Sequence, residues 1–313
     1  MTIDIIIVNW NSGDQLSNCL ASISRFGSEY VSKVIVVDNG SSDSSGDGLE
    51  RFDFPLEIIH NHLNRGFAHA CNQGADLCDA RYLLFLNPDA ALFENSLTVP
   101  LAFMDDEANQ DVGICGIQLV DEKGRVTSTC ARFPSLSRFI VHALGLNRIP
   151  RLKGGGVHMN DWDHLSDRSV DHVIGAFFFV RRDVFEEING FDERFFVYLE
   201  DVDFSLRAKK AGWETIYLTG AQSFHKGGGT SERVKATRLF YSLRSRLLYG
   251  FKYFPRWQAW ALFGITMFVE PVARLVFCGA RGQWGGMIDT LRGYRMLWEG
   301  LAEVAHSRGK GKE

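Results

Sequence analysis

Short apolar runs alternate with helical patterns through the N-terminal third of the chain. Residues 3–8 and 33–37 are rich in β-branched side chains without strict alternation, as expected of strands buried on both faces. Between them, four apolar residues share one face of a predicted helix: Leu16, Cys19, Leu20 and Ile23. Strand, helix and strand in this order predict a mostly parallel sheet with right-handed crossovers.

The same pattern continues along the chain. Strands are predicted at residues 56–59, 82–86, 113–120, 125–128, 172–180 and 213–218. Helices are predicted at residues 66–78, 97–105, 183–188 and 201–211, and a long loop with a short helix near 136–144 covers residues 132–169. These elements predict an α/β domain over residues 1–230, with a Rossmann-like sheet at its centre.

Beyond residue 230 the pattern turns helical, aromatic and basic. Between Arg238 and Arg295 the sequence has nine arginine or lysine residues and only two acidic ones, Glu270 and Asp289. Such composition is typical of helices at a membrane surface, although an oligomer interface or a helical cap fits it as well. The longest uncharged apolar run, 259–269, is shorter than the roughly 20 residues that span a bilayer, so we expect surface attachment without a transmembrane span.

Composition narrows the class of protein. A chain of 313 residues with 45% hydrophobic content can bury a large core, and a net charge of -4 gives no support to nucleic-acid binding. Six scattered cysteines without CxxC spacing indicate a reducing compartment, and no secretory signal is visible. We therefore expect a cytoplasmic protein, peripheral on the inner face of the cytoplasmic membrane.

Polar clusters follow successive apolar strands or open a helix, and parallel strands would bring them to one edge of the sheet. They are Asn9-Trp10-Asn11, the segment 38–43, Asn64-Arg65-Gly66-Phe67 with Asn72, and Asn87-Pro88-Asp89. Any one of them is more simply a turn, but their regular recurrence predicts a nucleotide half-site. Asp38 can accept the imide N–H of a pyrimidine, Trp10 can stack on the base, and Arg65 can meet a phosphate.

Asp89 is the strongest candidate for chemistry. The strand before it is apolar throughout, and Pro88 cannot continue the hydrogen-bond ladder, so Asp89 emerges at the carboxyl end of the strand. A hard divalent cation held by one or two carboxylates commonly shares its other ligands with substrate phosphates. His225 is a second candidate ligand for a metal or a phosphate, with a surface histidine as the alternative.

A second acidic cluster lies at the start of the helix predicted at 201–211. Glu200 and Asp201 stand at its first residues, with Asp203 in the first turn. Acidic residues there are often caps that favour the helix dipole. A carboxylate kept ionised at this position is also a competent general base, so both interpretations stay open from the residues alone.

Seven motifs in order resemble those of family 2 inverting glycosyltransferases with the GT-A fold, particularly the rhamnosyltransferase-like branch. They are Asn9-Trp10-Asn11, Val37-Asp-Asn-Gly-Ser-Ser-Asp43, Asn64-Arg65-Gly66-Phe67, Asn87-Pro88-Asp89, Gly190-Phe-Asp-Glu193, Glu200-Asp201-Val202-Asp203 and Phe224-His225. The resemblance covers residues 1–230. It implies a nucleotide-sugar donor, a divalent metal (Mg²⁺ or Mn²⁺), and a lipid-linked or oligosaccharide acceptor in bacterial surface polysaccharide synthesis. One departure is Asn87, which stands where many members carry the first Asp of a DxD motif.

The resemblance also implies a role for each matching residue. The nucleotide sugar would be bound by Asn9, Trp10, Asp38, Asn39, Asp43, Arg65, Asn72 and Asn87. Asp89 and His225 would hold the metal, Asp201 would be the base, and Glu200 would position the acceptor or Asp201 itself.

We therefore predict an inverting, metal-dependent transferase that uses dTDP-L-rhamnose. A UDP-sugar donor, such as one of galactofuranose or N-acetylhexosamine, is an alternative. A non-catalytic nucleotide-sugar-binding scaffold is another. A sugar nucleotidyltransferase would carry a basic, glycine-rich loop after the first strand, but residues 9–13 contain no Lys or Arg.

Overall fold

A computed structural model describes residues 2–49, 52, 54–146, 155–227 and 234–301. By their contacts the described residues form two compact units. Unit 1 takes its residues from Met1–Phe133, Trp162–Glu193 and Glu200–Thr230, and unit 2 from Pro134–Asp161, Arg194–Leu199 and Ser231–Glu313. Two segments that precede residue 230 therefore belong with the C-terminal helices, and residues 147–154 of the predicted long loop lie outside the described residues.

Unit 1 is built on a nine-stranded sheet. Eight of its strands have the order β3-β2-β1-β4-β10-β6-β11-β5, and the ninth, β8, pairs with β11. Its first four strands are mutually parallel: β1 (Ile3–Asn9), β2 (Val31–Asp38), β3 (Leu56–His60) and β4 (Tyr82–Leu86). The crossovers include α1 (Asp14–Phe26) and α2 (Phe67–Ala75). All four apolar residues predicted to share a face of α1 are buried, and each leucine-sized side chain so placed contributes about 1.5–3 kcal/mol.

The second half of the sheet is mixed. Its strands are β5 (Ala90–Leu92), β6 (Val112–Val120), β8 (Arg168–Ser169), β10 (Phe177–Arg181) and β11 (Glu214–His225). β10 runs antiparallel to both β4 and β6, whereas β11 is parallel to β6. A separate small sheet pairs β7 (Cys130–Ala131) with β9 (His172–Val173). The helices are α3 (Thr98–Asp105), α5 (Arg182–Glu187) and α6 (Glu200–Ala211), with short 3-10 turns at Ser44–Gly46 and Glu107–Asn109.

Three strand predictions need correction. Residues 125–128 form no strand, because only Val126 makes an isolated bridge, to Val120. The strand predicted at 172–180 is two strands, β9 and β10, with a break at residues 174–176. The last strand runs on past residue 218 to His225, since Gln222, Ser223 and Phe224 resume pairing with β6 after an irregularity.

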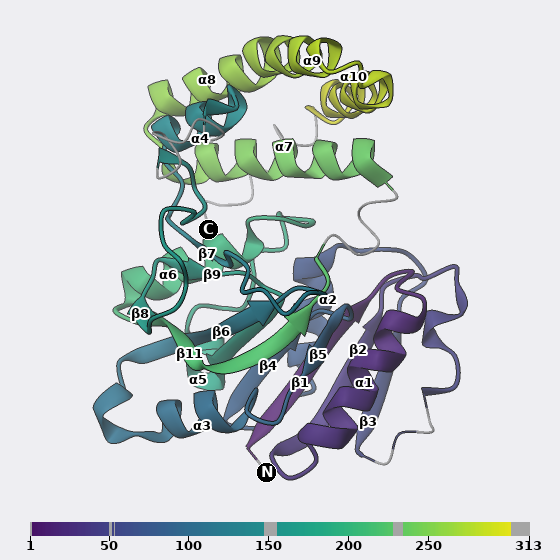
Figure 1. Cartoon of the computed structure of the whole chain (residues 1–313), viewed down its shortest axis with the longest axis vertical. Helices are drawn as coiled ribbons and strands as arrows, with labels where there is room; N and C mark the ends of the chain where they lie inside the picture. Colours follow the sequence, from purple (N-terminus) through teal and green to yellow (C-terminus); the bar gives the residue numbers. More distant parts are fainter. Residues whose placement is uncertain (1, 50–51, 53, 147–154, 228–233, 302–313) are drawn as a thin grey trace. The chain divides into compact units, whose positions relative to one another are not determined.

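Unit 2 consists of helices: α4 (Leu136–Ala143), α7 (Lys235–Tyr253), α8 (Arg256–Gly264), a π-helical turn η7 (Ile265–Val269), α9 (Glu270–Ala280) and α10 (Trp284–Glu299). Within this unit, α8, α9 and α10 form a layer over α7 (Figure 1). The fully buried Glu270 carboxylate pairs with Arg246 of α7 and, at 2.8 Å, with Arg274.

The helical segment Arg256–Ala280 is 25 residues long and apolar enough to cross a membrane by length and composition. This differs from the expectation drawn from the shorter uncharged run, because the helix continues through Glu270. The buried pairing of Glu270 with Arg246 ties this segment to α7, which is a reason for the helix to stay packed within unit 2.

Candidate active site at the carboxyl edge of the sheet

Asn9 and Asp38 end neighbouring parallel strands and are partners in the register. The buried Asn9 amide donates to Asp38 Oδ1 at 2.9 Å and to Ser45 Oγ at 2.9 Å. Asp38 keeps a side chain that is 14% exposed, with His60 Nδ1 3.7 Å from its other oxygen. Asn9 therefore fixes the orientation of Asp38 at the edge, while Trp10 follows it and is partly exposed.

Asp43 closes the loop after β2. Its Oδ2 accepts the Gly13 N–H at 3.0 Å, and its Oδ1 accepts the Ser45 N–H at 3.1 Å, which caps the Ser44–Gly46 turn. Burial alone would raise the pKa of Asp43, but these hydrogen bonds outweigh it and hold the pKa below its usual value. The carboxylate thus stays ionised where the loops after β1 and β2 meet.

Asn39 and Asn72 use their amides to shape loops. The buried Asn39 donates to Asn64 Oδ1 at 3.0 Å and accepts from the Arg65 N–H at 3.1 Å, which leaves the Arg65 side chain exposed. Asn72 exchanges two hydrogen bonds, both 2.9 Å, with the backbone of Phe191. Both amides are engaged within the protein, so their contribution to a nucleotide site runs through the position of Arg65 and of the loop at 190–193.

Asp89 and His225 face each other where β5 and β11 pair. The register places His225 beside Ala90, and His225 Nε2 lies 3.4 Å from Asp89 Oδ1. Both side chains are largely buried: that of His225 is 13% exposed and that of Asp89 is 9% exposed. Asn87 begins the turn between β4 and β5, and its backbone N–H donates to Ala176 O at 3.1 Å.

Asp89 and His225 fit a metal ion only in part. One carboxylate and one imidazole are sufficient protein ligands where substrate phosphates supply the rest. Among the residues that the structure describes, no group of three or more His, Cys, Asp or Glu side chains could hold a metal ion alone. Asp89 and His225 therefore suit a cation that arrives with a diphosphate better than a resident structural ion.

The Asp201 carboxylate is held by three contacts at the start of α6. Its Oδ2 accepts the Gly175 N–H at 2.9 Å, and its Oδ1 accepts the Val202 N–H at 2.8 Å. His172 Nε2 lies 3.5 Å from Oδ2, while His172 Nδ1 is 3.2 Å from Ser205 Oγ. Burial opposes ionisation, but His172 and the two N–H groups lower the pKa of Asp201. The side chain is 17% exposed, so an ionised oxygen remains within reach of a ligand.

Glu200 differs from its neighbour. It is buried, its Oε2 has no hydrogen-bond partner among the described residues, and burial together with the Asp201 charge raises the pKa of Glu200 well above its usual value. The two residues before it, Tyr198 and Leu199, have φ values of 69° and 65°, a strained conformation for non-glycine residues. The chain thus enters α6 with two adjacent carboxyl groups whose pKa values are shifted in opposite directions.

Replacing Glu200 with Gln is expected to stabilise the protein at alkaline pH. A raised native pKa means that the stability contributed by the neutral carboxyl group is present below the unfolded value and is lost as pH rises through the native value. The Gln variant stays neutral throughout. Thermal unfolding should show little difference near about pH 5 and a higher melting temperature for Glu200→Gln near about pH 8. A variant that melted lower at every pH would contradict the protonated state.

Asp203 and Arg207 hold the adjoining loop. The fully buried Asp203 carboxylate accepts from Arg207 Nε at 2.8 Å, and the guanidinium also donates to the carbonyls of Ile188 and Gly190, the latter at 2.6 Å. Gly190 lies against Asn72, whose Oδ1 would be 2.7 Å from an added Cβ. Arg207 is therefore a positioning residue for the segment that Asn72 also fixes.

Replacing Arg207 with Met is expected to cost about 3 kcal/mol of unfolding free energy, because it removes the guanidinium from a fully buried carboxylate. Chemical denaturation of the two proteins measures this difference. Lys123→Met, at an exposed turn position, is the control and should change stability by less than about 0.5 kcal/mol. Equal effects of the two substitutions would show that the contacts of Arg207 with Asp203 and with the carbonyls of the loop do not stabilise the protein.

The two halves of the site meet at β4 and β10. The backbone N–H of Asn87, two residues before Asp89, donates to the carbonyl of Ala176, and the N–H of the preceding residue, Gly175, donates to Asp201. Asp89 and Asp201 thus belong to one edge of the sheet, joined by a short backbone path. Sequence reasoning missed His172, Gly175, Ser205 and Arg207. Gly175 alone left a signal, since a glycine inside an apolar run indicates close approach, and an added Cβ would lie 3.3 Å from Asp201 Oδ2.

The sequence is similar to those of known proteins. A model of Glycosyl transferase family 2 matches residues 4–189. N-acetylglucosaminyl-diphospho-decaprenol L-rhamnosyltransferase of Mycobacterium tuberculosis is 29% identical over 248 residues, which cover 75% of this chain and 79% of that protein. Rhamnosyltransferase WbbL of Escherichia coli is 29% identical over 230 residues, covering 71% and 82%.

A solved structure shares the fold. Mannosyltransferase PcManGT from Pyrobaculum calidifontis, in complex with GDP-Man and Mn²⁺, aligns with a TM-score of 0.55 at 15% identity and covers 100% of this chain and 88% of its own. At that identity the likeness concerns the fold alone, and it agrees with the predicted GT-A architecture.

Proposed function

Because the chain belongs to glycosyl transferase family 2, we propose that it moves L-rhamnose from dTDP-L-rhamnose to a hydroxyl of a lipid-linked or glycan acceptor, with inversion, during assembly of a cell-surface polysaccharide. The rhamnosyltransferase names of two relatives support the sugar. The name of the mycobacterial relative, which includes diphospho-decaprenol, supports an acceptor on a lipid.

One observation supports catalysis above the others. Asp201 is kept ionised by Gly175, Val202 and His172, at the same sheet edge as Asp89. An ionised carboxylate with a partly exposed oxygen can accept the proton of an acceptor hydroxyl, and a second carboxylate at that edge can stand on the leaving-group side.

The proposed reaction needs one displacement. The acceptor oxygen bonds to the anomeric carbon as its proton passes to Asp201, and the bond from that carbon to the diphosphate breaks with its electron pair. The nucleoside diphosphate leaves on the opposite face, so the configuration inverts without a covalent enzyme intermediate. Asp38 would bind the base of the donor, Arg65 its phosphates, and the neutral Glu200 would support Asp201.

Asp89 and His225 are the residues that would hold a divalent cation, Mg²⁺ or Mn²⁺. When bound, such a cation would supply positive charge against the departing diphosphate. The Asp89 carboxylate and the His225 imidazole are already oriented toward each other, so little reorganisation is needed for both to bind it.

The helices of unit 2 support attachment to the cytoplasmic face of a membrane. Their exposed basic residues include Arg256, Arg281 and Arg292, and their exposed aromatic residues include Trp257 and Trp284. Cations of this kind meet anionic headgroups, and aromatic rings favour the same depth. Salt-sensitive flotation with anionic vesicles is the expected behaviour, and an oligomer interface would show instead as self-association without lipid.

A donor panel tests the proposed function. The purified full chain is assayed with dTDP-rhamnose, UDP-N-acetylglucosamine and UDP-galactofuranose, with Mg²⁺, Mn²⁺ or chelator, and with N-acetylglucosaminyl-diphospho-decaprenol as acceptor. We expect transfer from dTDP-rhamnose that depends on metal. Turnover of a UDP-sugar alone would replace the donor, and donor binding without any transfer would favour a non-catalytic scaffold.

A further inference from the structure

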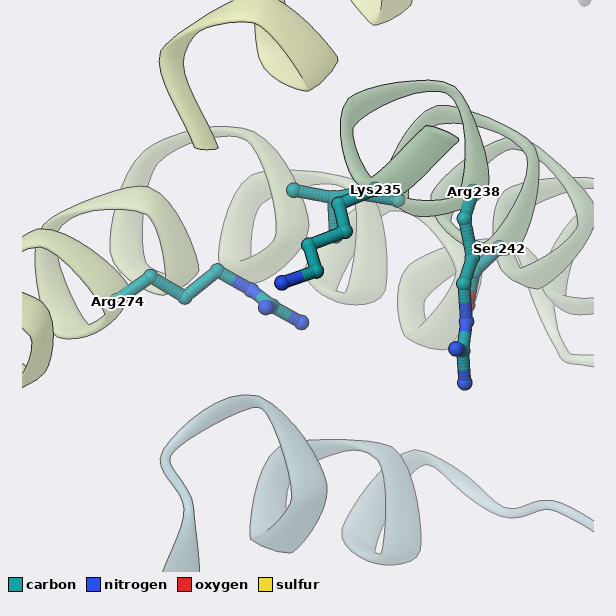
Figure 2. Close-up of a pocket in the computed structure, with 5 residues that line it drawn as sticks. Lys235, Arg238, Ser242 and Arg274 are labelled. Atoms are coloured by element: carbon teal, nitrogen blue, oxygen red, sulfur yellow. The ribbon is translucent and has the colours of Figure 1, made fainter. Parts of the chain in front are cut away.

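Unit 2 contains a cationic cavity of about 480 Å³ between α7 and α9. It is lined by Lys235, Arg238, Leu239, Ser242 and Arg274. Figure 2 shows the ends of Lys235 and Arg274 close to each other, with Arg238 and Ser242 to the right of Lys235. The described lining thus has three cationic side chains and no carboxylate.

The cavity carries positive charge that no carboxylate fully compensates, and one of its three cations, Arg274, is held in place by an ion pair. Glu270 holds Arg274 through Nε at 2.9 Å, but Glu270 also pairs with Arg246, so one carboxylate serves two guanidinium groups. Within the described residues, Lys235 and Arg238 form no ion pair. A guanidinium oriented in advance beside two uncompensated cations is suited to an anion with more than one charge.

The other side of these helices is apolar and exposed. Ten of the fifteen exposed large hydrophobic residues in the described chain belong to α8, η7, α9 and α10. They are Trp257, Trp260, Phe268, Val269, Val272, Val276, Trp284, Ile288, Leu291 and Trp298. Phe268 and Trp298 are in ring contact at 6.1 Å, which joins the stripe on η7 and α9 to the stripe on α10.

The apolar stripes and the cavity lie on opposite sides of the outer helices. Arg274 is two positions from both Val272 and Val276, which at 100° per residue places it on the far side of α9. On α10, the face opposite the stripe carries Gly293, which approaches Ala236 and Leu239 of α7. The cavity is therefore about one helix diameter, roughly 10–12 Å, behind the apolar surface.

That depth matches the headgroup layer of a bilayer. A helix that lies in a membrane interface buries its apolar face by roughly 5–10 Å, so groups one helix diameter behind that face reach the level of the lipid phosphates. A phosphate-bearing lipid whose chain lies in the bilayer can thus present its anionic group to Lys235, Arg238 and Arg274.

We propose that this cavity binds the diphosphate of the lipid-linked acceptor and thereby holds the acceptor by its lipid end. The inference rests on the proposed function and names the acceptor class within it. Three cationic side chains favour the doubly charged diphosphate diester over the singly charged phosphodiester of an ordinary phospholipid. The exposed stripe on α8 to α10 would at the same time lie in the bilayer that carries the acceptor.

The test uses the full chain and two kinds of vesicle. Phosphatidylcholine vesicles carry either N-acetylglucosaminyl-diphospho-decaprenol, a doubly charged diphosphate diester, or the singly charged phosphatidylglycerol at twice its mole fraction, so that the surface charge is equal. Lys235→Gln/Arg238→Gln removes two exposed cations and keeps the Arg274–Glu270 pair. Arg25→Gln/Lys123→Gln is the control, since it removes the same charge from exposed positions of unit 1. Melting temperatures check that both variants fold.

We expect the wild-type protein and the control to prefer diphosphate vesicles, and the Lys235/Arg238 variant to lose about tenfold in that affinity. In transfer assays the same variant should show a raised acceptor KM at unchanged donor KM. Equal binding of the two vesicles by the wild-type protein, or a preference retained by the variant, would overturn the proposal. Diphosphate preference in a protein that transferred no sugar would support the cavity and count against the proposed function.

Discussion

Asp201→Asn is expected to lower the rate of sugar transfer by about 10²–10⁴-fold while donor binding is retained. Asn keeps the shape of the side chain, but its single oxygen can accept only one of the Gly175 and Val202 N–H groups, so a melting temperature is measured to check that α6 still begins as before. The amide cannot take a proton from an acceptor hydroxyl. Steady-state transfer assays together with thermal shifts on donor addition separate the lost step from lost binding.

The control for this substitution is Asp183→Asn. Asp183 is an exposed acidic residue in the first turn of α5, so it shares the helix position of Asp201 without its contacts to Gly175 and His172. Its variant should keep wild-type activity. Transfer by Asp201→Asn at the wild-type rate would remove Asp201 from the role of base and leave it as a cap of α6.

Asp89→Asn is expected to reduce kcat by about 10²–10³-fold and to weaken metal-dependent nucleotide binding. The substitution removes the negative charge that faces His225 but preserves the turn between β4 and β5. A metal bridging protein and diphosphate would lose its only carboxylate among the two candidate ligands. Thermal shifts with dTDP and Mn²⁺, added separately and together, give a readout independent of turnover.

Asp79→Asn serves as the matched control, because that carboxylate is 89% exposed and pairs with Lys33 at the surface. Its nucleotide and metal response should equal that of the wild-type protein. If Asp89→Asn retained a full joint shift with dTDP and Mn²⁺, the cation would have to be held elsewhere or not be needed.

The fold was largely predictable because its first half follows a simple local rule. Buried parallel strands give continuous apolar runs, and 82–86 was predicted with the bounds that β4 has. The errors arose where pairing overrides local pattern. The apolar run 172–180 contains a break because β9 pairs with β7 in the small sheet, whereas β10 pairs with β4 and β6 in the main one. The strand β11 continues past residue 218 because its later residues pair with β6 and β5.

The sequence could predict which residues stand at the edge of the sheet, but not the contacts that these residues make with one another. Asn9, Asp38, Asp89 and Asp201 stand at strand ends or a helix start, which sequence can locate. Their partners lie far along the chain and carry no local mark: His172 meets Asp201 across 29 positions, and Asn72 meets Phe191 across 119. The opposite pKa shifts of Glu200 and Asp201 depend on burial and on those partners, so the two adjacent residues in the sequence give no reason for them.

The place of β10 in the sheet bears on how the protein is made. It lies between β4 and β6 and pairs with both, yet both are synthesised before it. A nascent chain that has completed β6 therefore carries unpaired N–H and C=O groups on the edges of β4 and β6 that β10 later joins, the kind of surface that favours pairing with other chains. The strand β10 can pair with β4 and β6 only after residue 181 has been added. These two edges therefore stay unpaired, and exposed to aggregation, until late in synthesis.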